Sequence, residues 1–292
     1  MKSNPFKGFG VALATPFRTD GTVDHTALRS LVRDIIDNGA DFLCVLGTTA
    51  ETPTLTFEER EAIKQTVKEE TRGCMPLLLG AGGNCTQAVC EELRRKGSTE
   101  GFDGVLIVTP FYNKPSQEGL FQHYKAVSAA TPLPVVLYNV PGRTGVNLMP
   151  ETVLRLALAC ENIVAIKEAS GRVVQAQDII RDAPDGFDVI CGDDGITPEL
   201  LSVGAVGVIS VIGNAFPQAF ADMTHAGIEG DFAKVREIHQ RLNPFYRLML
   251  VDGNPAGIKS LLALQHKAEN ILRLPLVPAS EATQKALREA ME

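Results

Sequence analysis

A lysine stands at the end of a short apolar run, and its amine is the strongest candidate for chemistry in this sequence. Lys167 directly follows Ile163–Ile166, and apolar residues at every position are typical of strands buried on both faces of a parallel sheet. Partial desolvation or a nearby cation would favour the neutral amine, the form that attacks a carbonyl carbon. We therefore predict that Lys167 is a Schiff-base nucleophile. The alternative is a solvated lysine that closes a strand.

Two other apolar runs lead into groups that suit a carbonyl substrate bearing a carboxylate. The run Pro134–Leu137 continues into the phenol of Tyr138 and the guanidinium of Arg143. The run Phe42–Leu46 continues into Gly47–Glu51, a small-residue turn whose N–H groups and hydroxyls could bind a carboxylate. Because the carboxyl ends of parallel strands meet at one rim, we expect the amine, the phenol and the guanidinium to converge there.

The composition indicates a globular protein that acts on small molecules. The chain has 292 residues, 45% of them apolar, and a formal net charge of -7, so it has no basic stripe that would bind nucleic acid. We find no apolar stretch long enough to span a membrane and no charged-then-apolar leader at Met1–Pro5. The expected partners are small molecules, with no nucleic acid and no membrane, and the expected location is the cytoplasm.

Neither a metal nor a bound cofactor is indicated. The six cysteines include no Cys-x-x-Cys pair and the five histidines no His-x-x-x-His spacing, so we predict no metal site and interpret the cysteines as small core residues. Asp193 and Asp194 precede a turn and a helix start, and we predict that they cap it. The P-loop pattern and the dinucleotide fingerprint are also absent.

The order of predicted elements indicates a (β/α)8 TIM barrel with a C-terminal helical extension. Apolar runs alternate with stretches of helical period, which favours a closed barrel over an open doubly wound sheet. After the last run the pattern is wholly helical. We expect residues 1–227 to form the catalytic barrel and residues 228–292 a helical region packed on it. The predicted strands are Gly10–Ala14, Phe42–Leu46, Pro76–Leu79, Gly104–Val108, Pro134–Tyr138, Ile163–Lys167, Asp188–Cys191 and Val206–Ser210.

Five sequence blocks occur in the order and spacing of a known family: Gly47–Glu51, Val108–Gly119, Tyr138–Gly145, Ile166–Ala169 and Gly192–Asp194. Across nearly its whole length the chain resembles the pyruvate-dependent class I aldolases, the N-acetylneuraminate lyase family, and within them the dihydrodipicolinate synthase branch. The resemblance implies a lyase that condenses pyruvate with L-aspartate 4-semialdehyde through a lysine Schiff base. The product would be 4-hydroxy-tetrahydrodipicolinate, on the route to lysine and diaminopimelate, and no cofactor is implied.

The resemblance also assigns catalytic roles. Lys167 would form the imine with pyruvate, and Tyr138 would relay protons through a hydroxyl chain with Thr48 and Tyr112. The backbone of Thr48 and Thr49 would bind the pyruvate carboxylate. In the family the equivalent of Tyr112 comes from the neighbouring subunit, so a homo-oligomer is implied, built as a tetramer from two dimers.

Three further positions are implied to bind substrate. Arg143 would hold the carboxylate of aspartate semialdehyde, since its guanidinium fork suits a carboxylate. Gly192 and the backbone carbonyl of Ile209 would line the site. One alternative is a class I aldolase for another 2-keto acid, such as N-acetylneuraminate or 2-keto-3-deoxygluconate, which Arg143 disfavours. The other alternative is a metabolite-binding barrel without activity.

The chain departs from family members that lysine inhibits. Their lysine-binding positions at the dimer interface are occupied here by Phe57, Arg60, Ala88 and Phe111, and only Asn84 matches. We therefore expect weak or absent feedback inhibition by lysine.

Overall fold

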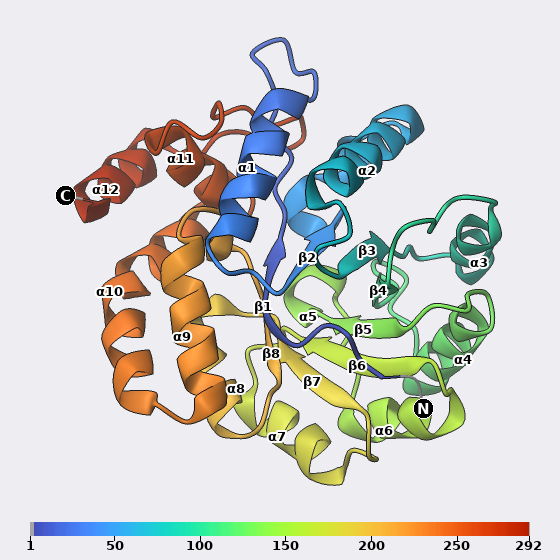
Figure 1. The fold of residues 1–292 in the computed structure, drawn as a ribbon. Coiled ribbons are helices and arrows are strands. Elements are labelled where there is room, and N and C mark those ends of the chain that lie inside the picture. Colours follow the sequence, from blue (N-terminus) through green and yellow to red (C-terminus); the bar gives the residue numbers. More distant parts are fainter. Residues whose placement is uncertain (1–2, 292) are drawn as a thin grey trace.

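Within residues 3–291, which the computed structural model describes, parallel strands close into a single barrel (Figure 1). Each strand pairs with the next along the chain, and β8 pairs with β1. The predicted TIM barrel is confirmed, and the strand ends shift by a few residues at most. The strands are β1 (Gly8–Ala12), β2 (Phe42–Val45), β3 (Leu77–Ala81), β4 (Gly104–Val108), β5 (Val135–Asn139), β6 (Ile163–Glu168), β7 (Asp188–Cys191) and β8 (Gly207–Ser210).

Side chains alternate along most of each strand between the barrel interior and the surrounding helices; the exception in β6 is a register shift against β5, where Val164 and Ala165 both belong to the interior cluster. Val136 and Tyr138 of β5 belong to an apolar cluster inside the barrel, together with Ala165 of β6. Their neighbours along the strands, such as Ile166, pack in the larger core between strands and helices. Because side chains two residues apart share a face, Lys167 lies on the same inward face as Ala165.

Helices surround the barrel and cover its strands (Figure 1). The start of α2 is fixed by a capping box, in which Thr56 accepts from the Glu59 N–H and the Glu59 carboxylate accepts from the Thr56 N–H. Besides the predicted helices there is a short one, α5, directly after β5. The helices from the start of the chain to the one that follows β8 are α1 (His25–Asp37), α2 (Phe57–Thr71), α3 (Thr86–Arg94), α4 (Gln117–Ser128), α5 (Pro141–Thr144), α6 (Pro150–Ala159), α7 (Val173–Asp182), α8 (Thr197–Ser202) and α9 (Pro217–Glu229).

The C-terminal region is helical, as predicted, and consists of α10 (Phe232–Val251), α11 (Ala256–Leu264) and α12 (Glu281–Met291). In Figure 1 these helices lie on one side of the barrel, and α10 packs against α9. The proposed division between residues 227 and 228 falls inside α9, whose last residue is Glu229. Of the helices in the described part of the chain, none is long and apolar enough to cross a membrane.

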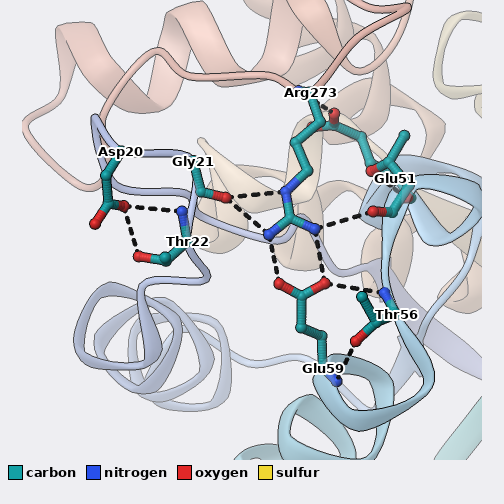
Figure 2. A network of polar contacts seen from close by, with 8 residues as sticks. Asp20, Gly21, Thr22, Glu51, Thr56, Glu59 and Arg273 are labelled. Carbon is teal, nitrogen blue, oxygen red and sulfur yellow. Dashed lines mark hydrogen bonds and ion pairs between the residues drawn. The ribbon is translucent and has the colours of Figure 1, made fainter.

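A single arginine ties the C-terminal region to the start of α2 (Figure 2). The Arg273 guanidinium donates to both carboxylate oxygens of Glu59 and to the carbonyl oxygens of Gly21 and Thr54. This paired geometry is the strongest form of arginine–carboxylate contact. Arg273 therefore joins three segments that are far apart in the sequence, and its hydrogen bonds hold the pKa of Glu59 at about 2.

This tie predicts a pH-dependent contribution to stability. The pKa of Glu59 is lowered in the folded state, from an ordinary value of 4.5 to about 2. The stabilisation is therefore complete above pH 4.5 and is lost as the pH falls towards 2. We expect Glu59→Gln, which can still cap the helix, to lower the free energy of unfolding at pH 7 by about 1–3 kcal/mol.

The measurement is urea unfolding of both proteins between pH 7 and pH 2, over which the difference should shrink. Glu118→Gln is the matched control, because Glu118 pairs with Arg155 and both side chains are more than half exposed. Exposed pairs contribute about 0–1 kcal/mol. Equal losses in the two variants would contradict the assignment.

Candidate active site

Lys167 points into the barrel from β6, beside Tyr138 of β5. The two residues are partners in the register of the two strands, and the Lys167 Nζ atom lies 4.5 Å from the centroid of the Tyr138 ring. Both side chains are buried. The neighbouring Cys44 is no rival nucleophile, because burial raises the pKa of its thiol to about 11, a rise that the charge of Lys167 only partly opposes.

A cavity of about 180 Å³ opens at the carboxyl ends of the strands around Lys167. It is smaller than the roughly 300–1,000 Å³ of sites for drug-sized ligands, which suits a substrate of few atoms. The structure thus brings together most of the side chains singled out in the sequence. Those that line the cavity are Thr48, Thr49, Tyr138, Arg143, Lys167 and Gly192.

Gly192 leaves room for the Lys167 side chain. A Cβ atom at this position would lie 3.0 Å from both Cγ and Cε of Lys167 and 2.7 Å from the Cβ of Ala169. Any other residue would therefore push the lysine stem or its strand aside. The position needs a glycine for space, since its backbone is not in the left-handed region.

The turn Gly47–Glu51, here named the carboxylate turn, is bracketed by strained residues. Leu46 has a φ of 58° and Glu51 a φ of 55°, a left-handed conformation that is costly for residues with a Cβ. The Thr52 hydroxyl donates to the carbonyl oxygens of Leu46 and Gly47. Strain of this kind persists only where surrounding contacts hold it, and it often accompanies function.

Asn254 reaches the cavity from the loop between α10 and α11, and sequence reasoning missed it. Its side-chain nitrogen donates to the Thr49 hydroxyl at 3.0 Å. Its backbone carbonyl oxygen accepts from the Arg143 guanidinium at 3.0 Å. The sequence Gly253–Pro255 indicates only a turn between helices, so the contact depends on how the C-terminal region docks.

The two aspartates after β7 have different roles. Asp193 caps the short turn that follows, accepting from the Gly195 N–H at 3.0 Å, as predicted. The capping prediction is wrong for Asp194, whose carboxylate instead accepts from the N–H groups of Val211 and Ile212 beyond β8. Burial raises the pKa of Asp194 to about 6. This carboxylate binds the loop after β8 to the wall of the cavity.

Glu168, the residue after Lys167, holds the ends of β5 and β6 in place. Its buried carboxylate accepts from the side-chain amides of Asn139 and Gln175 and from the Ser170 N–H. Because these partners come from β5, from the loop after β6 and from α7, they restrict how the tip of β6 can move. The sequence had suggested no role for Glu168.

Two of the predicted site residues do not line the cavity within one chain. The Tyr112 side chain is 88% exposed, although its backbone is held in the left-handed region at a φ of 73°. Ile209 is fully buried inside the barrel.

A larger hollow of about 520 Å³ adjoins the cavity and shares Thr48, Tyr138 and Arg143 with it. Phe57, Arg60 and Phe111 also line this hollow. Phe57 and Phe111 are more than two-fifths exposed, so the single chain leaves an apolar surface beside its candidate site.

No group of three or more His, Cys, Asp or Glu side chains within residues 3–291 is placed to hold a metal ion. Cys44, Cys90, Cys160 and Cys191 are buried, as expected for core residues. The same interpretation is wrong for Cys74 and Cys85, which are exposed.

Comparison with known proteins identifies the family. The model of the dihydrodipicolinate synthetase family matches residues 5–292. A curated relative from Phocaeicola vulgatus, named 4-hydroxy-tetrahydrodipicolinate synthase, is 57% identical, with 99% of this chain and 97% of the relative covered.

Solved structures agree with this result. A dihydrodipicolinate synthase from Thermotoga maritima is 43% identical with a TM-score of 0.95, covering 99% of this chain and 98% of that one. Another, described as the first monomeric dihydrodipicolinate synthase variant, is 42% identical with a TM-score of 0.94, and the match covers 98% of this chain and 96% of that one. On the match over its whole length and on the geometry around Lys167, this chain belongs to the dihydrodipicolinate synthetase family.

Proposed function

We propose that Lys167 carries the reaction of this chain by forming an imine with pyruvate. The activity is that of 4-hydroxy-tetrahydrodipicolinate synthase, a lyase that condenses pyruvate with L-aspartate 4-semialdehyde in lysine and diaminopimelate biosynthesis. The observation that carries the proposal is the inward amine of Lys167 in a small cavity that also contains Tyr138, Arg143 and the carboxylate turn.

The pyruvate carboxylate would bind at the carboxylate turn, against Thr48 and Thr49. This would leave the ketone carbon facing the Lys167 amine, which adds to it and, with loss of water, forms the imine. The imine nitrogen then withdraws electrons from the methyl group, so that a proton leaves and an enamine forms. The enamine carbon attacks the aldehyde, and the amino group of the second substrate displaces Lys167 as the ring closes.

Tyr138 is placed to move the protons that these steps require. Its ring lies against the amine of Lys167, and it lines the cavity together with Thr48. Forming the imine expels water and forming the enamine releases a proton, so a phenol in a chain of hydroxyls suits the role of acid and base. We propose that Tyr112 of a second subunit completes this chain.

Arg143 would select the second substrate. It lies in α5 at the mouth of the cavity, and it lines both the cavity and the adjoining hollow. A guanidinium at this place suits an aldehyde that carries a carboxylate, as aspartate semialdehyde does. This disfavours the alternative of an aldolase for N-acetylneuraminate or 2-keto-3-deoxygluconate. The alternative of an inactive barrel does not explain why the polar groups gather at Lys167.

We infer that the working enzyme is a homo-oligomer in the cytoplasm, with a dimer as the catalytic unit and a tetramer built from two dimers. The support is the exposed Tyr112 with its strained backbone and the apolar hollow beside the site. Two-fold symmetry would let each subunit supply its Tyr112 to the other.

Reduction with borohydride in the presence of pyruvate should inactivate the enzyme and add a reduced pyruvyl group to Lys167. The reagent converts the imine to a stable amine, which peptide mass spectrometry locates. The Lys167→Ala variant should remain unlabelled. A label on any other lysine would overturn the proposed nucleophile.

Replacing Arg143 should separate the two substrates. We expect Arg143→Ala to leave the borohydride trapping of pyruvate intact and to lower kcat/KM for aspartate semialdehyde about 30- to 900-fold, which corresponds to a loss of about 2–4 kcal/mol of transition-state stabilisation. Arg143→Lys keeps the positive charge but loses the forked guanidinium, so its kcat/KM for aspartate semialdehyde should lie between those of the wild type and Arg143→Ala. An equal loss of pyruvate trapping in Arg143→Ala would contradict the assignment. The measurements are steady-state kinetics and mass spectrometry of the trapped protein.

Tyr112 can be tested by mixing subunits. Tyr112→Phe and Lys167→Ala should each be nearly inactive alone and should recover activity when co-expressed, because a mixed dimer regenerates one intact site. Different affinity tags on the two chains allow mixed dimers to be isolated and assayed. Mixed dimers without activity would show that Tyr112 does not act across the subunit interface.

A further inference from the structure

A buried ion pair lies next to the carboxylate turn, and the mechanism above does not use it. Glu51 ends the turn and pairs with Lys259 of α11. The Glu51 side chain is fully buried and that of Lys259 is 1% exposed. Neither residue lines the cavity around Lys167. The pair therefore needs an explanation other than contact with substrate.

Several contacts fix both partners in place. The Lys259 ammonium also donates to the Ile271 carbonyl oxygen at 2.9 Å and lies 3.9 Å from the centroid of the Phe17 ring. The second carboxylate oxygen of Glu51 accepts from the backbone N–H of Arg273 at 3.1 Å; Figure 2 shows these two residues side by side. The C-terminal region thus contacts the end of the turn through two residues, Lys259 and Arg273.

Stability alone does not account for a charge pair in this position. Removing two charges from water costs several kcal/mol per ion, and well-packed apolar side chains often stabilise a fold equally well. What the pair supplies is a fixed position for a residue held at a φ of 55°. The Glu51 N–H donates to the Thr48 carbonyl oxygen at 3.2 Å. A displaced Glu51 would therefore also displace Thr48.

A second contact also links the C-terminal region to the carboxylate turn. Asn254, also from the C-terminal region, donates to the hydroxyl of Thr49. Both threonines of the carboxylate turn are thus tied, directly or through Glu51, to residues that lie about 200 positions later in the chain.

We propose that Glu51 is a positioning residue for pyruvate binding, and that the C-terminal region sets the shape of the carboxylate turn through its ion pair with Lys259. This inference rests on the proposed function, in which that turn binds the pyruvate carboxylate. The turn holds the carboxylate equally in the substrate complex and in the transition state. Disturbing it should therefore raise the KM for pyruvate by more than it lowers kcat, to which the Thr48 hydroxyl contributes through the proposed proton relay.

The test is steady-state kinetics of Glu51→Gln, which keeps the shape and the hydrogen bond to Arg273 but loses the ion pair. We expect the KM for pyruvate to rise about tenfold, with kcat within about threefold and the KM for aspartate semialdehyde within about twofold of the wild type. Folding is checked by circular dichroism. If Glu51→Gln does not fold because Lys259 is left unpaired, the double variant with Lys259→Met, which has no unpaired buried charge, is measured in its place.

Glu59→Gln is the matched control, because it cuts another ion pair of the C-terminal region, Arg273–Glu59, and leaves both Glu51 and Lys259 in place. Its KM for pyruvate should equal that of the wild type. An unchanged KM in the Glu51 variant, or an equal rise in Glu59→Gln, would overturn the inference. Borohydride trapping separates this failure from that of the proposed function: wild-type enzyme that takes no label at Lys167 would refute the function itself.

Discussion

Closure of the parallel barrel is the constraint on which the candidate site depends. In a closed barrel every strand ends at the same rim, and alternate side chains point inward. Ala165 and Lys167 therefore share the inner face of β6, as Val136 and Tyr138 do on β5. The register between β5 and β6 then sets the amine against the phenol ring. A shift of one residue would turn Lys167 outward into the helical layer and abolish the site.

The loops at this rim are held by buried polar groups as well as by apolar packing. Glu168 gathers donors from β5, from its own loop and from α7. Asp194 binds the loop beyond β8, and Glu51 holds the carboxylate turn from α11. Each of these carboxylates is buried and is satisfied by hydrogen bonds or an ion pair. Buried polar networks that are satisfied in this way make a structure rigid. The candidate site thus has a small set of polar groups facing the cavity and, behind them, buried carboxylates that hold the loops in place.

The C-terminal helices are more than a cover for the barrel. Asn254, Lys259 and Arg273 all reach back to segments in the first quarter of the chain. Arg273 also places its guanidinium 4.5 Å from the centroid of the Phe17 ring, on the ring that Lys259 contacts too. These contacts join the region after α9 to the loops of β1 and β2. A barrel without its C-terminal region would lose the supports of its carboxylate turn.

The strands, the barrel and most of the residues around Lys167 could be predicted from the amino-acid sequence. Local apolar patterns predict strands because burial on both faces demands apolar side chains at each position, and strand ends predict the rim. Parallel closure then brings together residues that follow different strands, such as Thr48 and Arg143. The family blocks added Gly192, which no periodicity would single out.

The contacts of the loops and of the C-terminal region with the barrel could not be predicted in this way, because they depend on the folded arrangement of distant segments. Asn254 and Lys259 carry no local signal, since their roles arise from docking between segments about 200 residues apart. The sequence around Asp194 is typical of a helix cap. In the fold, however, its carboxylate accepts hydrogen bonds from the N–H groups of Val211 and Ile212, which are far from it in the local sequence. Tyr112 is exposed and does not line the cavity of its own chain. Local sequence patterns describe what a segment can form by itself, whereas long-range polar contacts depend on the position of every other segment.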